Sequence, residues 1–347
     1  MGVSLIQATV SSDRLSRRWL VLLGCSLALG GGCAVDQQQA RVHLAEGEAA
    51  LTANKLETAL AEFQEAVRLA PDSVEGHVKL GLAHKQIGSL NQAVDALRRA
   101  VRLDPANFVA TYELGEVYRA LNKLSQAIRA YLIACELEPL NFDARVALAS
   151  CYHSTGELEQ AEQAYQAALA IEPRNAAAWS NLGTIYHVRG RGYDAIRAYK
   201  ESLECDTQQP AVLVNMATVY LHQERWDTAR RTLRVALDID PNFAPGHERM
   251  GYCLWRQGQY EEAAARYKQA MQLDSRNATA WAGFGVVRMT QHLNEPGNLT
   301  YRDEALEAWH RSLEIDSRQV KLRALLEKYQ PKTAAPPLQF DVLSDMR

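Results

Sequence analysis

The chain has 347 residues, of which 47% are hydrophobic and 23% are charged, and its formal net charge is −3. This balance indicates a folded protein and excludes a disordered one. A protein that wraps nucleic acid needs a basic face, and no long run of Lys or Arg is present. We therefore expect no nucleic-acid partner.

The first 33 residues have the features of an export signal. Arg14, Arg17 and Arg18 precede an apolar run over residues 19–33, which is shorter than the ~20 residues that a membrane-spanning helix needs. The run ends in small residues before Cys33 and resembles the signal of bacterial lipoproteins, in which cleavage leaves a lipid-modified cysteine. The resemblance implies a signal peptide over residues 1–33, lipidation of Cys33 and a short linker over residues 34–39.

Other interpretations of this segment remain open. Lipoprotein signals prefer Leu three residues before the cysteine, where this chain has Gly30. Cys25 fits the local pattern better, but it follows a core of only about five apolar residues. We expect an exported protein that is lipid-anchored to a bacterial membrane on its periplasmic or outer face. A soluble periplasmic protein and an uncleaved N-terminal anchor are the alternatives.

From Ala40 onward the sequence repeats every 34 residues, with units starting at positions 40, 74, 108, 142, 176, 210, 244 and 278. Position 20 of every unit is Ala, position 8 is Gly or Ala, and position 24 is large and apolar. The fifth unit has Trp179, Leu182, Gly183 and Tyr186. This pattern resembles the tetratricopeptide repeat family. The resemblance implies an all-α, right-handed superhelical solenoid of eight helix-turn-helix repeats over residues 40–317.

The physical properties of each unit agree with this pattern. Two amphipathic segments are separated by a break such as Gly88–Ser89. Small residues at position 8 let two helix backbones approach, and the large residue at position 24 fills the space between them. Helices of about 14 residues are marginal alone. Each hairpin must therefore bury its apolar face against the next one.

The C-terminal part departs from the repeat. The eighth unit has about eight extra residues near positions 292–300, which we interpret as a surface insertion between its helices. Residues 320–329 have a helical pattern and predict a capping helix within 318–330. Residues 331–347 contain three prolines and predict a flexible tail.

No residue pattern of an enzyme is present. Outside the signal and the repeats only about 30 residues remain, too few for a catalytic domain, and phosphate-loop, zinc-protease and serine-hydrolase motifs are absent. We expect no catalytic residue, cofactor, metal site or small-molecule substrate. The cysteines of the repeats are interpreted as small buried apolar residues: Cys135, Cys151, Cys205 and Cys253.

In the tetratricopeptide family the first helices of the hairpins line a concave groove. The resemblance implies that the first helices of this chain also line such a groove. The positions expected to face the groove are charged in the early units: Arg41, Glu48, Lys79, Lys85, Glu113, Glu116 and Arg119. They are mostly uncharged in units four to six and partly aromatic in unit seven. We predict a partner-binding surface formed by Asn181, Asn215, Thr184, Thr218, His187, Tyr252, Trp255 and Arg256.

Asn181 and Asn215 share position 6 in adjacent units. The pair is similar to part of the asparagine ladder in the repeat domain of O-linked GlcNAc transferases, where the amides bind the backbone of an extended peptide. A side-chain amide suits this role because it both donates and accepts hydrogen bonds. Ordinary exposed asparagines are the alternative.

The sequence therefore predicts a scaffold at the bacterial cell envelope that binds an extended peptide or helix of a protein partner. Two alternatives remain open. The chain could be a structural protein that self-associates, or a subunit that recruits a separately encoded enzyme. The identity of the partner does not follow from the sequence, because one repeat frame serves many partners.

Overall fold

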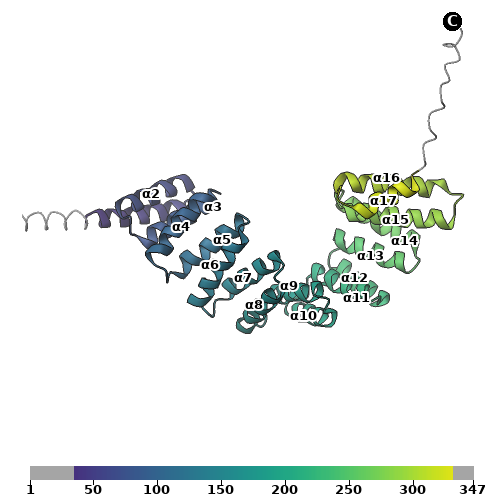
Figure 1. The fold of residues 1–347 in the computed structure, drawn as a ribbon, viewed down its shortest axis with the longest axis horizontal. Helices are drawn as coiled ribbons and strands as arrows, with labels where there is room; N and C mark the ends of the chain where they lie inside the picture. Colours follow the sequence, from purple (N-terminus) through teal and green to yellow (C-terminus); the bar gives the residue numbers. More distant parts are fainter. Residues whose placement is uncertain (1–34, 331–347) are drawn as a thin grey trace, which may run out of the picture. The chain divides into compact units, whose positions relative to one another are not determined.

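The computed structural model describes residues 35–330, which form helices joined by short turns without any strand. Successive helices form antiparallel pairs, and within each of the two units described below every pair packs on the next along the sequence (Figure 1). The predicted all-α repeat solenoid is therefore confirmed. The chain divides between Glu172 and Pro173 into two compact units, which are described in turn.

Unit 1 begins with a helix over residues 35–52, and seven further helices follow. Starting with α3, each first helix is 13 or 14 residues long and each second helix has 14. The bounds are α2 Leu56–Leu69, α3 Val74–Gln86, α4 Leu90–Leu103, α5 Phe108–Ala120, α6 Leu124–Leu137, α7 Phe142–Thr155 and α8 Leu158–Ile171.

Unit 2 continues the alternation of first and second helices and ends with an unpaired helix that packs on α16. The bounds are α9 Ala176–Val188, α10 Gly192–Cys205, α11 Pro210–His222, α12 Trp226–Ile239, α13 Ala244–Arg256, α14 Tyr260–Leu273, α15 Ala278–Asn294, α16 Leu299–Ile315 and α17 Val320–Tyr329.

Side-chain caps fix where several first helices begin. The side chains of Asn107, Asn141, Asn175 and Asn277 each accept a hydrogen bond from the backbone N–H three residues on, at 2.9–3.1 Å. Such caps satisfy a donor that has no partner inside the helix. Because the Asn follows the turn that ends the previous hairpin, it also fixes the residue at which the next hairpin begins.

A close contact between a small and a large residue holds the two helices of each hairpin together. In unit 2, a Cβ placed on Gly183 would lie 2.7 Å from ring atoms of Tyr199. Gly115 has the same relation to Tyr131 in unit 1, again at 2.7 Å. Both rings are fully buried. Glycine at these positions therefore lets the first helix lie directly on an aromatic ring.

The predicted loop insertion in the eighth unit is wrong, because the extra residues lengthen both helices instead. α15 and α16 each have 17 residues and are joined by only four, 295–298. Arg288 lies inside this longer hairpin, 8% exposed, and its Nε is 2.7 Å from a carboxylate oxygen of Glu304. Its Nη1 also donates to Gln291 at 2.8 Å. These contacts compensate a buried charge that would otherwise destabilise the added turns.

α17 covers the end of the last hairpin. Leu322 and Leu326 are buried against Trp309, and the ring of Tyr329 lies 6.2 Å from that of Trp309. None of the helices in residues 35–330 is both long and apolar enough to cross a bilayer. The predicted signal peptide, Cys33 with its alternative Cys25, and the predicted tail at 331–347 lie outside the described residues.

Candidate functional site

The residues predicted to bind a partner lie on three successive first helices of unit 2. Asn181, Thr184 and His187 are on α9, Asn215 and Thr218 on α11, and Tyr252, Trp255 and Arg256 on α13. Side chains of neighbouring first helices are in contact: His187 contacts His222 on α11, and Trp255 contacts Thr290 on α15. We call the surface formed by these eight residues and His222 the first-helix face of unit 2.

The two asparagines carry the free hydrogen-bonding capacity of this face. Asn181 and Asn215 are exposed, and neither side-chain amide makes a hydrogen bond within residues 35–330. The nearby threonines differ, because their hydroxyls are already used. Thr184 and Thr218 donate to backbone carbonyls one turn earlier, at 3.1 and 2.9 Å. The amides are therefore available to a ligand, whereas the hydroxyls are already hydrogen-bonded within the protein.

Two histidines from neighbouring repeats lie in contact on the same face. Nε2 of His187 and Nδ1 of His222 are 3.0 Å apart, and the ring centroids are 5.0 Å apart. They line an open cleft of about 490 Å³ together with Val188 and Tyr193, which is 83% exposed. Burial lowers the pKa of His187, and the charges of His222 and Arg249 lower it further. The pair therefore favours a neutral form of His187.

An ordered aromatic group continues the face on α13. The indole N–H of Trp255 donates to Thr290 on α15 at 3.2 Å, and its ring lies 5.8 Å from that of Tyr252. Arg256 donates to the hydroxyl of Tyr252 at 3.1 Å and stacks over Trp226 at 4.5 Å. Both aromatic rings on α13 are half-buried, so they offer apolar surface in a fixed orientation.

In unit 1 the corresponding charges pair with one another. Lys79 reaches Glu48, and Lys85 lies 2.6 Å from Glu113 on the next first helix. Glu116 accepts hydrogen bonds from Arg119 and Tyr131; burial opposes its ionisation, but these bonds outweigh burial and lower its pKa. The charges predicted to face a partner therefore largely compensate each other within the protein.

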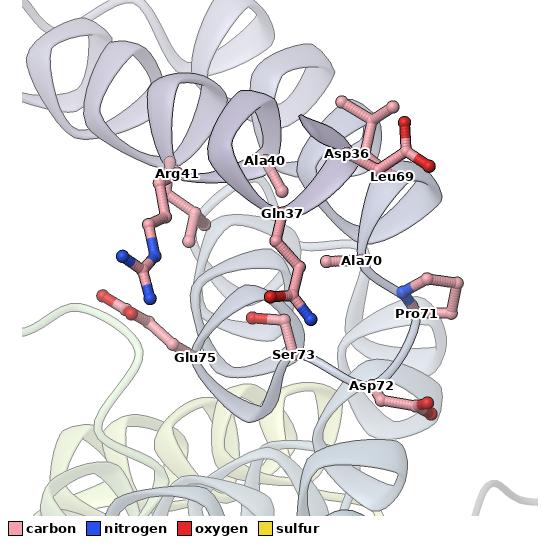
Figure 2. Close-up of a pocket in the computed structure, with 11 residues that line it drawn as sticks. Asp36, Gln37, Ala40, Arg41, Leu69, Ala70, Pro71, Asp72, Ser73 and Glu75 are labelled. Carbon is pink, nitrogen blue, oxygen red and sulfur yellow. The ribbon is translucent and has the colours of Figure 1, made fainter. Parts of the chain in front are cut away.

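Sequence reasoning missed two features of unit 1. An open cleft of about 480 Å³ lies between the helix of residues 35–52 and the turn from α2 to α3, with Arg41 and Glu75 on opposite sides (Figure 2). The side chains of His43, Glu46 and Glu62 also converge. The spacing His43-x-x-Glu46 on one helix was a signal for this group, but Glu62 comes from another helix.

The four cysteines of the described chain are free. Cys151 and Cys253 are buried, and burial raises the pKa of Cys253 to about 11. The thiol of Cys253 donates to the backbone carbonyl of Trp226 at 3.4 Å. Because the reactive form of a cysteine is the thiolate, Cys151 and Cys253 act as small buried apolar residues, as predicted. Cys135 and Cys205 are only partly buried, which differs from the prediction.

The helices form hairpins that repeat every 34 residues, and in each hairpin a small residue of one helix packs under a large residue of the other. This architecture defines a helical-repeat solenoid, a class of protein that binds other proteins. A family model described as the cilia and flagella-associated protein 70 C-terminal domain, a tetratricopeptide repeat domain, matches residues 73–283. A second model, for the tetratricopeptide repeat itself, matches residues 47–88. The chain belongs to the tetratricopeptide repeat family, as the sequence predicted. No curated protein matches it.

Several solved structures share the fold. A tetratricopeptide repeat protein from Parabacteroides merdae is 19% identical with a TM-score of 0.61, over 74% of this chain and 98% of that one. Cut9–Hcn1 of the APC/C is 18% identical with a TM-score of 0.56, over 79% and 52%. PilF from Pseudomonas aeruginosa is 22% identical with a TM-score of 0.52, over 65% and 98%. At these identities the similarity shows the fold alone.

The histidine pair makes the stability of the protein depend on pH. The pKa of His187 is lower in the folded chain than its ordinary value of 6.5. Below that value the unfolded chain binds a proton that the folded chain does not, so the free energy of unfolding falls as the pH falls. Urea unfolding between about pH 7.5 and about pH 5.5 should show a smaller decrease for His187→Asn/His222→Asn than for wild type. Equal decreases in the two proteins would contradict the assignment of the pH dependence to the histidine pair.

Proposed function

We propose that this protein-interaction scaffold captures an extended peptide or helix of a partner protein on the first-helix face of unit 2. The observation that carries the proposal is the pair of exposed amides of Asn181 and Asn215. They occupy the same repeat position on the first helices α9 and α11, and their side-chain amides make no hydrogen bond within the described chain. An extended backbone offers a donor and an acceptor at regular spacing, which is what such amides can pair with.

The aromatic group on α13 supports the same proposal. Trp255 is held by Thr290 before any partner arrives, so little side-chain entropy is lost on binding. Half-buried Trp and Tyr side chains are the residue types that most often dominate binding energy. Polar groups on α9 and α11 would fix the register of the bound segment, and the rings on α13 would supply apolar contact.

We further propose that the chain has no catalytic activity of its own and acts at the bacterial cell envelope. Tetratricopeptide repeat proteins are typically non-catalytic scaffolds. The envelope location rests on the signal-like sequence before Cys33. Self-association, or recruitment of a separately encoded enzyme, remains the alternative use of the same scaffold.

A capture experiment tests the binding face. The variant Asn181→Ala/Asn215→Ala/Trp255→Ala is expected to retain at least about tenfold less partner from envelope extracts than wild type, because each lost hydrogen bond contributes about 0.5–1.5 kcal/mol. Mass spectrometry of the captured proteins is the measurement. Lys200→Ala/Val235→Ala, on exposed sites of second helices in the same unit, is the matched control. Unchanged capture by the triple variant would remove the face from the proposal and favour self-association.

Metabolic labelling with a palmitate analogue tests the membrane anchor. Wild type should incorporate the label and partition with membranes, and Cys33→Ala should do neither, because the thiol that carries the lipid is gone. Cys25→Ala should behave as wild type. Label retained by Cys33→Ala but lost from Cys25→Ala would move the anchor to Cys25, and an unlabelled wild type would contradict lipidation.

A further inference from the structure

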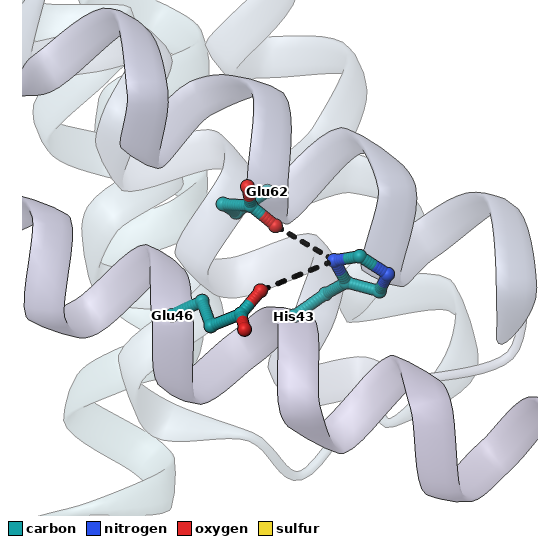
Figure 3. Close-up of side chains that lie close together, drawn as sticks. All are labelled: His43, Glu46 and Glu62. Carbon is teal, nitrogen blue, oxygen red and sulfur yellow. Dashed lines mark hydrogen bonds and ion pairs between the residues drawn. The ribbon is translucent and has the colours of Figure 1, made fainter.

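Three side chains of metal-ligating types converge on the first hairpin of unit 1 and are not part of the first-helix face of unit 2. His43 and Glu46 lie one turn apart on the helix of residues 35–52, and Glu62 comes from α2. Nδ1 of His43 is 2.6 Å from Oε2 of Glu62 and 3.8 Å from Oε2 of Glu46. Figure 3 shows both carboxylates directed at the same edge of the imidazole ring.

We propose that these three side chains form a binding site for a divalent transition-metal ion of the Zn²⁺ class. The ligands are one imidazole nitrogen and two carboxylate oxygens, all within 4.8 Å of one another. Around such an ion, with bonds of about 2.0–2.2 Å, neighbouring ligand atoms lie about 3–4 Å apart. The 3.8 Å distance lies within this range, and the 2.6 Å distance lies below it, so the carboxylate of Glu62 must rotate away from the ring to admit an ion. Water would complete the coordination, since Glu46 is exposed.

Charge favours a cation over a simple hydrogen bond at this place. Nδ1 of His43 carries at most one proton, which it can share with Glu62, and this leaves the carboxylate of Glu46 without a hydrogen of its own. Two carboxylates in such proximity repel each other, and a divalent cation compensates both at once. The next carboxylate, Glu65, is held by Arg68 through hydrogen bonds of 2.8 and 2.5 Å, so it does not compete for the ion.

An ion at this site would fasten the helix of residues 35–52 to α2. Within residues 35–330 this hairpin has a neighbouring hairpin on one side only, so it should open more readily than one with neighbours on both sides. The apolar core of this hairpin is Phe63 packed over Gly47, with Leu44, Leu51, Leu60 and small alanines around it. A ligand that binds only the folded hairpin stabilises it. The site therefore acts as a metal-dependent clip between the two helices of this hairpin.

The test uses the full-length chain without a histidine tag, in a Cys25→Ser/Cys33→Ser background that removes two of the six thiols; the other four are present in every variant. Protein stripped with EDTA is titrated with Zn²⁺ by calorimetry, and the bound metal is counted after dialysis. The ligand variants are His43→Asn, Glu46→Gln and Glu62→Gln. The control is His187→Asn/His222→Asn, which removes a close pair of imidazole nitrogens outside the proposed site.

One ion should bind per chain in wild type and in the control, with a rise in Tm that EDTA reverses. Each ligand variant should bind at least about tenfold more weakly. Glu46→Gln changes only an exposed side chain, so its circular dichroism spectrum should match wild type and exclude misfolding. Absence of Zn²⁺ binding by wild type, or equal affinity in wild type and the ligand variants, would overturn the site. Partner capture by unit 2 does not depend on this result.

Discussion

The contact between a small residue of the first helix and a large residue of the second is the constraint on which the rest of the structure depends. Gly183 beneath Tyr199 and Gly115 beneath Tyr131 leave no room for a Cβ, so the two backbones lie as close as a glycine allows. Where the second helix offers Leu233, the first has Ala217, and both are fully buried. This contact sets the geometry of the hairpins, and the hairpin geometry sets which side chains of the first helix point away from the second.

The two units use their first helices differently. In unit 1 the charged residues form ion pairs between and within neighbouring helices, such as Lys85 with Glu113, so they contribute to the array itself. Exposed pairs of this kind add little stability, but they occupy the groups that a partner would otherwise meet. In unit 2 the amides of Asn181 and Asn215 are unoccupied and an aromatic pair is already ordered beside them. These unoccupied amides and the ordered rings are the reason why we propose the partner-binding face in unit 2.

The repeat fold could be predicted because its determinants recur at fixed spacing. Alanine at position 20 and a large residue at position 24 identify the packed face without knowledge of the structure. The eighth unit was misjudged because an insertion has no period. Whether added residues form a loop or extend a helix depends on tertiary contacts, here those of Arg288 with Glu304 on α16 and with Glu261 on α14. The positions of the candidate binding residues on first helices followed from the repeat phase. The hydrogen bonds of Thr184, Trp255 and His222 required coordinates, and so did the approach of Glu62 to His43.

Hydrogen exchange of the full-length chain tests most directly whether the hairpins depend on their neighbours. A Gly183→Val substitution places a bulky side chain against Tyr199, and amide protection should fall in α9 and α10. If each hairpin relies on the next for burial of its apolar face, protection should also fall in α11 and α12, to a smaller extent, while α15 to α17 change least. Undiminished protection of α11 and α12 beside an opened α9–α10 hairpin would contradict the account.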